Sequence, residues 1–148
     1  GLVDIYLPDF KYSENDLAVK YSSAPYYFDN FKQVLCEMRS QVNDVINEDS
    51  GVMEQGLIIR HLVLPGNIQN SIGVLKAIKE LIGVDVFISL MSQYCPLHRA
   101  ELYNELSRRL SNEEYQLVCD SFYELGFHKG FLQDLSSATE EHIPDFFA

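Results

Sequence analysis

Two patterns of apolar residues alternate along the chain. Nearly continuous runs rich in Val, Ile, Leu and aromatic residues predict four strands, over residues 2–8, 56–64, 85–91 and, more weakly, 129–133. The run at 56–64 is apolar at almost every position, which is typical of a strand covered on both faces of a parallel sheet. Turn-forming residues bound each run, so the strands are predicted to be short and separate.

Between the strands, apolar residues recur every three or four positions and predict amphipathic helices. The longest begins with Ser-Ala-Pro at residues 23–25 and is predicted to run through Val45, about five to six turns. A second ends at Gly83, and a third opens with a capping box formed by Ser111 and Glu114. A short helix is predicted over residues 15–21 before the first of these.

The alternation of strands and helices predicts an α/β protein with a parallel sheet, right-handed crossovers and outer helices. An open doubly wound sheet and an arc of a barrel both fit this order. A complete eight-unit barrel needs roughly 250 residues, so the 148 residues here would supply an incomplete TIM-like half barrel of about four parallel strands. The chain opens inside a predicted strand without an initiator Met, and we therefore expect a fragment of a longer protein.

Composition narrows the classes of partner. Asp and Glu total 22 against 11 Lys and Arg, and a net charge of −11 argues strongly against a nucleic-acid-binding surface and against docking on anionic lipid. No apolar run approaches the roughly 18 to 20 residues of a membrane span. The three cysteines lie far apart and cannot all pair within one chain, which favours a reducing, cytoplasmic location.

Candidate chemistry is expected beyond the carboxyl ends of the strands, where ligands bind in both architectures. Asp9 and Lys11 follow the first strand and, being two residues apart, should point the same way. Arg60 stands among apolar neighbours in the second strand, and Gln93 follows the third. Together these groups suit a zwitterionic or anionic small ligand. A solvated Asp-x-Lys loop and a purely structural ion pair of a buried Arg60 are the alternative interpretations.

Other polar or reactive residues give weaker indications of a functional site. His61 lies on the other face of its strand and is predicted to pack beneath a helix. Cys95 and His98 make only half a metal site, so no zinc site is expected. Cys36 and Cys119 fall within amphipathic helices and are predicted to be small core residues. The chain lacks a dinucleotide fingerprint, a phosphate loop and a nucleophile elbow.

Several segments, in order, resemble the later half of radical S-adenosylmethionine proteins, and above all the relatives of pyruvate formate-lyase activating enzyme. They are DIYLPDFKY at residues 4–12, LIIRHLVLPG at residues 57–66 and ISLMSQY at residues 88–94. The closing segments GFHKGFLQ (126–133), SSATE (136–140) and IPDF (143–146) resemble one branch of that group. The similarity spans nearly the whole chain.

The resemblance implies a partial (β/α) barrel that binds S-adenosylmethionine and a 4Fe-4S cluster. Such proteins cleave S-adenosylmethionine reductively, and the activating enzymes abstract hydrogen from a glycine of a partner enzyme. Asp9 and Lys11 match an Asp-x-Lys beside the bound cofactor. Arg60 matches a cofactor-contacting Arg of the penultimate barrel strand, and Leu62 a residue that also borders the cofactor. Gln93 falls where activating enzymes often place a His.

The sequence departs from the family in lacking its Cys-x-x-x-Cys-x-x-Cys cluster loop. We therefore expect residues 1–148 to be the C-terminal portion of the barrel, without metal ligands and inactive alone, although the parent would be a radical enzyme. An uncovered barrel edge should make the chain self-associate. The alternatives are a non-catalytic acidic α/β module that binds a protein partner, and an ordinary barrel enzyme fragment that binds an anionic metabolite at Lys11 and Arg60.

Overall fold

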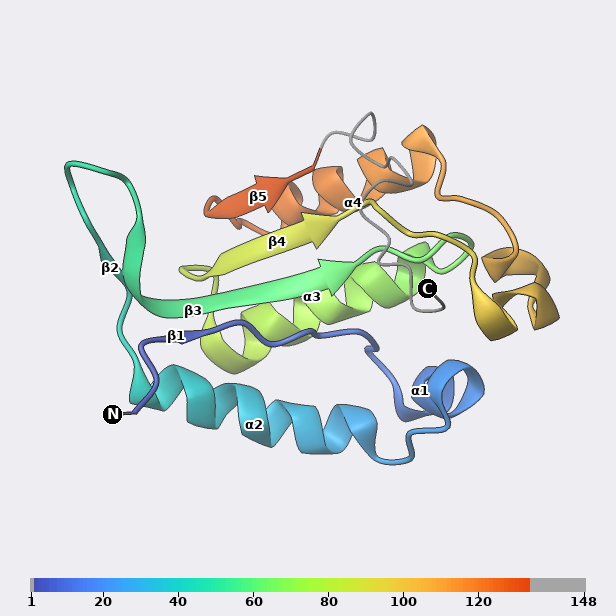
Figure 1. The fold of residues 1–148 in the computed structure, drawn as a ribbon, viewed down its shortest axis with the longest axis horizontal. Helices are drawn as coiled ribbons and strands as arrows, with labels where there is room; N and C mark the ends of the chain where they lie inside the picture. The colour runs from blue at the N-terminus through green and yellow to red at the C-terminus, as the bar shows by residue number, and fades with distance from the viewer. Residues whose placement is uncertain (1, 134–148) are drawn as a thin grey trace, which may run out of the picture.

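The computed structural model describes residues 2–133 (Figure 1). In chain order the elements are β1 (Ile5–Tyr6), α1 (Asn15–Ser22), α2 (Tyr27–Gln41), β2 (Val45–Ile46), β3 (Met53–Leu62), α3 (Ile68–Ile82), β4 (Phe87–Met91), the 3₁₀ helices η1 (His98–Leu102) and η2 (Asn104–Leu106), α4 (Asn112–Glu124) and β5 (Gly130–Leu132).

The sheet confirms the predicted α/β class and the parallel strands. Its order is β1-β3-β4-β5, and each neighbouring pair in this order is parallel. Successive parallel strands therefore lie side by side in the order in which the chain makes them. The arrows of β3 and β4 point toward α1, which marks the carboxyl edge of the sheet (Figure 1).

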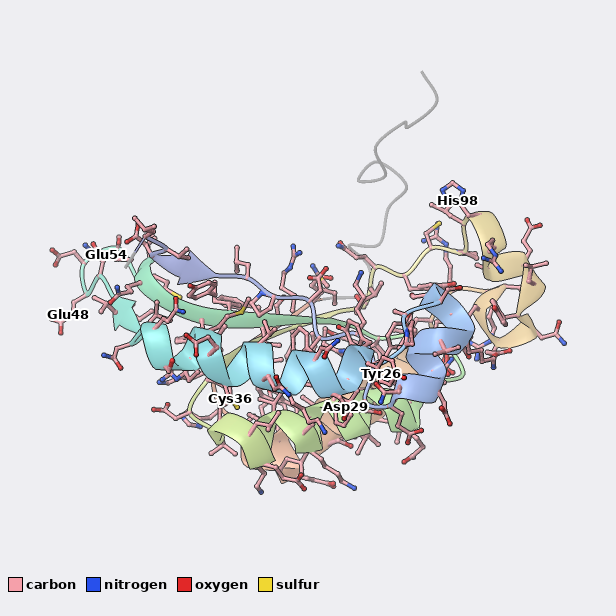
Figure 2. All side chains as sticks on the ribbon, turned by 90° about the horizontal axis from the view of Figure 1, so that it is seen from below. Tyr26, Asp29, Cys36, Glu48, Glu54 and His98 are labelled. Atoms are coloured by element: carbon pink, nitrogen blue, oxygen red, sulfur yellow. The ribbon has the colours of Figure 1, made fainter. Side chains whose placement is uncertain are left out.

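Helices α2, α3 and α4 pack on one face of the sheet (Figures 1 and 2). The side chains between them form one core, in which buried Leu57 and Ile59 of β3 and Ile88 of β4 contact the helix layer. The capping box predicted at the start of α4 is present, because Ser111 accepts a hydrogen bond from the Glu114 amide and the Glu114 carboxylate accepts one from Ser111. The strand and helix patterns thus account for a single two-layer unit.

Within residues 2–133, no helix packs against the other face of the sheet (Figure 2). Along β3, Ile59 and His61 are buried, whereas Ile58 and Leu62 are half-buried and Arg60 is exposed. We define the open face by the side chains that the strand registers place on this side: Ile5, Leu7, Asp9, Ile58, Arg60, Leu62, Phe87, Ser89, Met91 and Phe131. Parallel sheets ordinarily bury both faces, so a largely apolar open face is unusual in this kind of sheet.

The structure corrects the extent of the second helix. The helix predicted to reach Val45 ends at Gln41, and the chain turns so that β2 pairs antiparallel with β3. Val42 still packs in the core, which explains why the apolar spacing looked helical beyond the true end. Asp44 fixes the turn, because its carboxylate accepts a hydrogen bond from the Leu57 amide. β3 consequently begins earlier than predicted, at Met53.

The structure also bears on the predictions for the first strand and for two cysteines, whereas the closing segments are not described. The first strand is ladder-paired only over Ile5–Tyr6, although a parallel bridge between Asp9 and Arg60 resumes the pairing. Cys119 is buried as predicted, but the prediction for Cys36 is wrong, since it lies exposed on α2 (Figure 2). The closing segments at 136–140 and 143–146 lie outside the described residues.

Within residues 2–133, none of the helices combines the length and the apolar character that crossing a membrane requires.

Candidate binding site at the carboxyl edge

Three charged side chains predicted to converge do so on the open face. Nε of Arg60 lies 2.7 Å from Oδ1 of Asp9, and Nζ of Lys11 lies 4.0 Å from Oδ2 of the same carboxylate. The bridge between Asp9 and Arg60 sets these residues side by side on neighbouring strands. The pattern of alternating strand positions was therefore sufficient to find this group.

The group remains accessible to a ligand. The side chains of Asp9, Lys11 and Arg60 are 34%, 54% and 45% exposed, so the expectation that Arg60 is buried is wrong. Oδ1 of Asp9 is itself buried and, among the described residues, accepts no hydrogen bond despite its closeness to Arg60. Oδ1 therefore faces the Arg60 guanidinium away from solvent, and a ligand could reach only the partly exposed remainder of the carboxylate.

The remaining two predicted residues lie less centrally. Leu62 follows Arg60 on the same face of β3 and is half-buried, so it offers apolar surface beside the guanidinium. Gln93 is exposed just past the end of β4. In the part of the chain that the structure describes, no hydrogen bond joins Gln93 to the three charged side chains, and its role stays a prediction.

Phe10 anchors the segment that carries Asp9 and Lys11. Its ring is fully buried and stacks on Phe31 of α2 with 4.3 Å between ring centroids. Because neighbouring side chains in extended backbone point to opposite sides, burial of Phe10 turns the two flanking charged residues outward. The Phe10 amide donates to the carbonyl oxygen of Arg60 at 2.9 Å.

Three side chains from other elements bind the backbone of this segment. The Tyr27 hydroxyl donates to the Asp9 carbonyl at 2.8 Å and accepts from the Lys11 amide at 2.9 Å. Burial raises the pKa of Tyr27, which keeps its hydroxyl protonated. Asn70 donates to the Lys11 carbonyl at 2.9 Å.

His61 is the third of these side chains and lies where its strand position predicted. It is fully buried, with Nδ1 2.6 Å from the Phe10 carbonyl oxygen and Nε2 2.8 Å from Oγ of Ser71. Burial lowers the pKa of His61 to about 4, so the ring is neutral at physiological pH. Sequence reasoning identified its burial but missed its contact with the segment bearing the site.

The loops around this edge are tied to one another. Lys20 and Tyr21 of α1 both bind Oε1 of Glu105 in η2, at 2.6 and 2.7 Å. These hydrogen bonds lower the pKa of Glu105 to about 2. The Tyr103 hydroxyl also donates to the Lys20 carbonyl. The segment after β1 and the segment after β4 are therefore held together beside the site.

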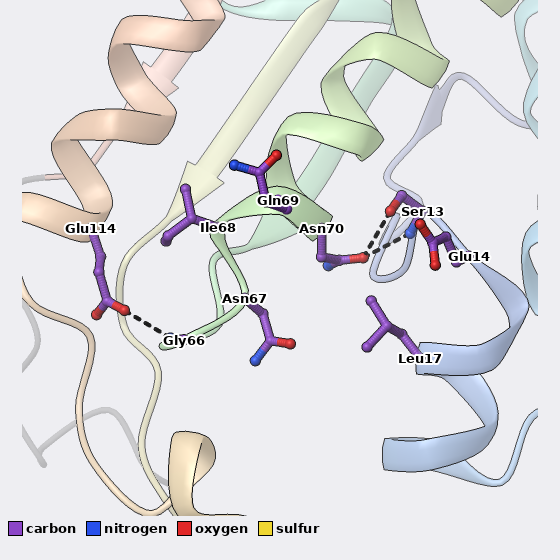
Figure 3. Close-up of a pocket in the computed structure, with 9 residues that line it drawn as sticks. All are labelled: Ser13, Glu14, Leu17, Gly66, Asn67, Ile68, Gln69, Asn70 and Glu114. Atoms are coloured by element: carbon purple, nitrogen blue, oxygen red, sulfur yellow. Dashed lines mark hydrogen bonds between the residues drawn. The ribbon is translucent and has the colours of Figure 1, made fainter.

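A separate hollow of about 510 Å³ opens near the start of α3 (Figure 3). Its lining includes the carboxylates of Glu14 and Glu114 but neither Lys nor Arg. Glu114 is bound to Arg108 and accepts from the Gly66 amide, and these contacts lower its pKa to about 2. An anionic ligand therefore suits the open face better than this hollow.

No metal centre is evident in residues 2–133, where no three His, Cys, Asp or Glu side chains are grouped as ligands. The three cysteines are free thiols on different elements or loops, with Cys36 exposed and Cys119 buried. These residues do not provide the ligand set of a 4Fe-4S cluster.

Comparison with known proteins gives one relationship that bears on the chain. It is 31% identical over 119 residues to the uncharacterized protein MJ0674 of Methanocaldococcus jannaschii. The alignment covers 78% of this chain but 30% of that protein, so the chain spans less than a third of the length of its curated relative. No protein-family model and no solved structure matches the chain.

Proposed function

We propose that this chain is an arc of the partial (β/α) barrel of a radical S-adenosylmethionine protein related to pyruvate formate-lyase activating enzyme. Its open face would form one wall of the S-adenosylmethionine pocket. The observation that carries the proposal is the grouping of Asp9, Lys11 and Arg60 on the sheet face that the helices leave uncovered.

The topology favours an arc of a barrel rather than a doubly wound sheet. A doubly wound sheet reverses its strand order and places helices on both faces. Here the parallel strands follow one another in chain order and the helices lie on one face. A barrel has this arrangement, with helices outside and side chains of the other face inside. The greater length of the relative is compatible with further strands in the parent protein.

The residues present fit the zwitterionic end of S-adenosylmethionine. The partly exposed carboxylate of Asp9 suits the ammonium group, and the cations of Lys11 and Arg60 suit the carboxylate. Leu62 would contact an apolar part of the cofactor, and Gln93 would contribute an amide at the rim. In the family that the sequence resembles, the cofactor supplies hydrogen abstraction, in activating enzymes from a glycine of a partner enzyme.

The residues present do not fit the iron–sulfur cluster, and we derive no step through it. The proposal places the cluster ligands in a part of the parent protein that this sequence does not contain. The chain alone would then bind the cofactor weakly and cleave none of it. The three free cysteines also support our proposal of a reducing, cytoplasmic location.

Two observations test this assignment. After anaerobic iron–sulfur reconstitution, UV-visible and EPR spectra should show no 4Fe-4S cluster in this chain, and S-adenosylmethionine should remain intact. The coding sequence upstream of Gly1 should encode three closely spaced cysteines. A start codon adjacent to Leu2, or a cluster assembled on this chain, would contradict the proposal, and the start codon would favour the protein-interaction module instead.

A further inference from the structure

The segment that carries Asp9 and Lys11 is held far more firmly than an exposed loop usually is. Its main-chain polar groups from the Asp9 carbonyl to the Lys11 carbonyl are each hydrogen-bonded to another element. The partners are the Tyr27 hydroxyl, the Arg60 carbonyl, the His61 ring and the Asn70 amide. Loops at ligand sites gain affinity from such advance ordering, because less conformational freedom is lost on binding.

Among these partners, His61 occupies a special place. Its strand neighbour Arg60 points to the open face, while His61 points into the core and meets the carbonyl of Phe10, the residue between Asp9 and Lys11. One residue pair of β3 therefore contacts both sides of the same segment. Any shift of the Phe10 peptide would move both flanking charged side chains relative to Arg60.

The contacts also fix the form of the ring. A carbonyl oxygen can only accept, so Nδ1 of His61 must carry the proton that reaches the Phe10 carbonyl. Nε2 is then the acceptor for the Ser71 hydroxyl at 2.8 Å. Ser71 is itself buried in α3, so the ring is held at both nitrogens between α3 and the segment after β1.

We infer that His61 is a positioning residue, which sets the segment bearing Asp9 and Lys11 through a hydrogen bond from Nδ1 to the Phe10 carbonyl. It touches no ligand itself. The inference rests on the proposed function for the identity of that ligand, but the geometry it assigns is independent of any cofactor.

The first test uses the unaltered chain. Long-range nitrogen-15 NMR correlations distinguish a protonated ring nitrogen from an unprotonated one. We expect His61 to show protonated Nδ1 and unprotonated Nε2 at neutral pH. The opposite tautomer, or a doubly protonated ring, would overturn the inference whatever the protein binds.

The second test separates positioning from simple filling of the core. In His61→Asn the side-chain amide replaces Nδ1 and can still donate to Phe10, whereas in His61→Gln the amide replaces Nε2 and keeps only the contact with Ser71. Both variants lose one buried hydrogen bond, so their overall destabilisation should be similar. Amide hydrogen exchange at Lys11 should quicken about tenfold in His61→Gln and far less in His61→Asn, measured against Ile88 in β4.

The inference would be contradicted if amide exchange at Lys11 quickened equally in the two variants, or if exchange at Ile88 quickened as much as at Lys11. Titration of both variants with S-adenosylmethionine then tests the proposed function separately. If exchange at Lys11 is slower in His61→Asn than in His61→Gln but both variants keep the wild-type affinity for S-adenosylmethionine, the positioning role is upheld and that ligand is rejected. A lower affinity in His61→Gln alone would uphold both.

Discussion

Arg60 and Asp9 form an ion pair across two neighbouring parallel strands, with 2.7 Å between Nε and Oδ1. A backbone bridge between the same two residues sets this contact. Both side chains are partly exposed, and ion pairs of this kind usually contribute about 0 to 1 kcal/mol to the free energy of unfolding. The pair is thus better suited to meeting a polar ligand than to stabilising the fold.

The first prediction concerns this pair. Arg60→Met should lower the free energy of unfolding by about 1 kcal/mol or less in urea titrations, because Lys11 remains near the Asp9 carboxylate. Lys32→Met is the matched control, since Lys32 pairs with Asp29 on the outer surface of α2 at 2.9 Å. A loss of several kcal/mol for Arg60→Met alone would make the pair a structural element and remove the reason for assigning it to a ligand.

The second prediction concerns acid stability. The pKa of His61 is lowered from 6.5 to about 4 in the fold, so the unfolded chain binds a proton first as the pH falls. The stability contributed by the neutral ring is complete above pH 6.5, declines as the pH falls toward 4, and changes no further below that. The full loss is about 3 kcal/mol.

Urea unfolding between about pH 7.5 and pH 5 isolates this effect. Glu105 and Glu114, whose pKa values are lowered to about 2, contribute stability that is lost mainly below pH 4.5. His61→Asn should flatten the dependence over the chosen interval. A wild-type profile that is already flat there, or an identical slope in the variant, would show that His61 is not a buried neutral ring.

The third prediction concerns the contact between α3 and the segment after β1. A methyl group at Gly73 would lie 2.6 Å from Oγ and 2.7 Å from Cβ of Ser13. Replacing Gly by Ala within a helix ordinarily stabilises it by about 1 kcal/mol. Here Gly73→Ala should instead destabilise the protein by about 1 to 3 kcal/mol, because the Ser13 backbone is held by Asn70.

A compensating change tests the cause. Ser13→Gly removes both atoms that the new methyl group would meet, so the double variant should recover most of the stability lost in Gly73→Ala. Thermal unfolding of the two single variants and the double variant gives the comparison. Additive losses would show that the close approach of Gly73 to Ser13 is not the source of the destabilisation.

The fourth prediction concerns self-association. Phe131 is 54% exposed on the open face, and Leu117 is 55% exposed on α4. If apolar surface on the open face drives association, light scattering at high concentration should show oligomers that Phe131→Glu disperses and Leu117→Glu does not. A compact monomer of the wild-type chain would contradict this prediction.

The sequence was sufficient to predict the fold and the site wherever the local pattern of residues agrees with the tertiary structure. β3, α3 and α4 carry periodic apolar residues and clear end signals, and the alternation along strands set Asp9, Lys11 and Arg60 on one face. The predicted end of α2 was wrong because Val45 fits a helical spacing as well as it fits a strand. Its actual state depends on pairing with β3, which no local signal reports.

The support beneath the site could not be predicted for a similar reason. Tyr27, His61 and Asn70 bind the backbone around Phe10 across long stretches of sequence. Each looks like an ordinary polar residue in the sequence, and only the packing of β3, α2 and α3 brings them to one segment. Cys36 shows the converse. Helical periodicity predicted that it faces the core, but α2 is oriented so that Cys36 is exposed.

The most direct test of the proposed pocket is a titration of the isotope-labelled chain with S-adenosylmethionine, followed by NMR. We predict saturable shifts at Asp9, Lys11 and Arg60, with affinity at least about tenfold weaker in Arg60→Met and unchanged in Lys32→Met. Shifts confined to the hollow near Gln69, or an affinity that Arg60→Met leaves unchanged, would contradict the assignment of the open face as the S-adenosylmethionine wall.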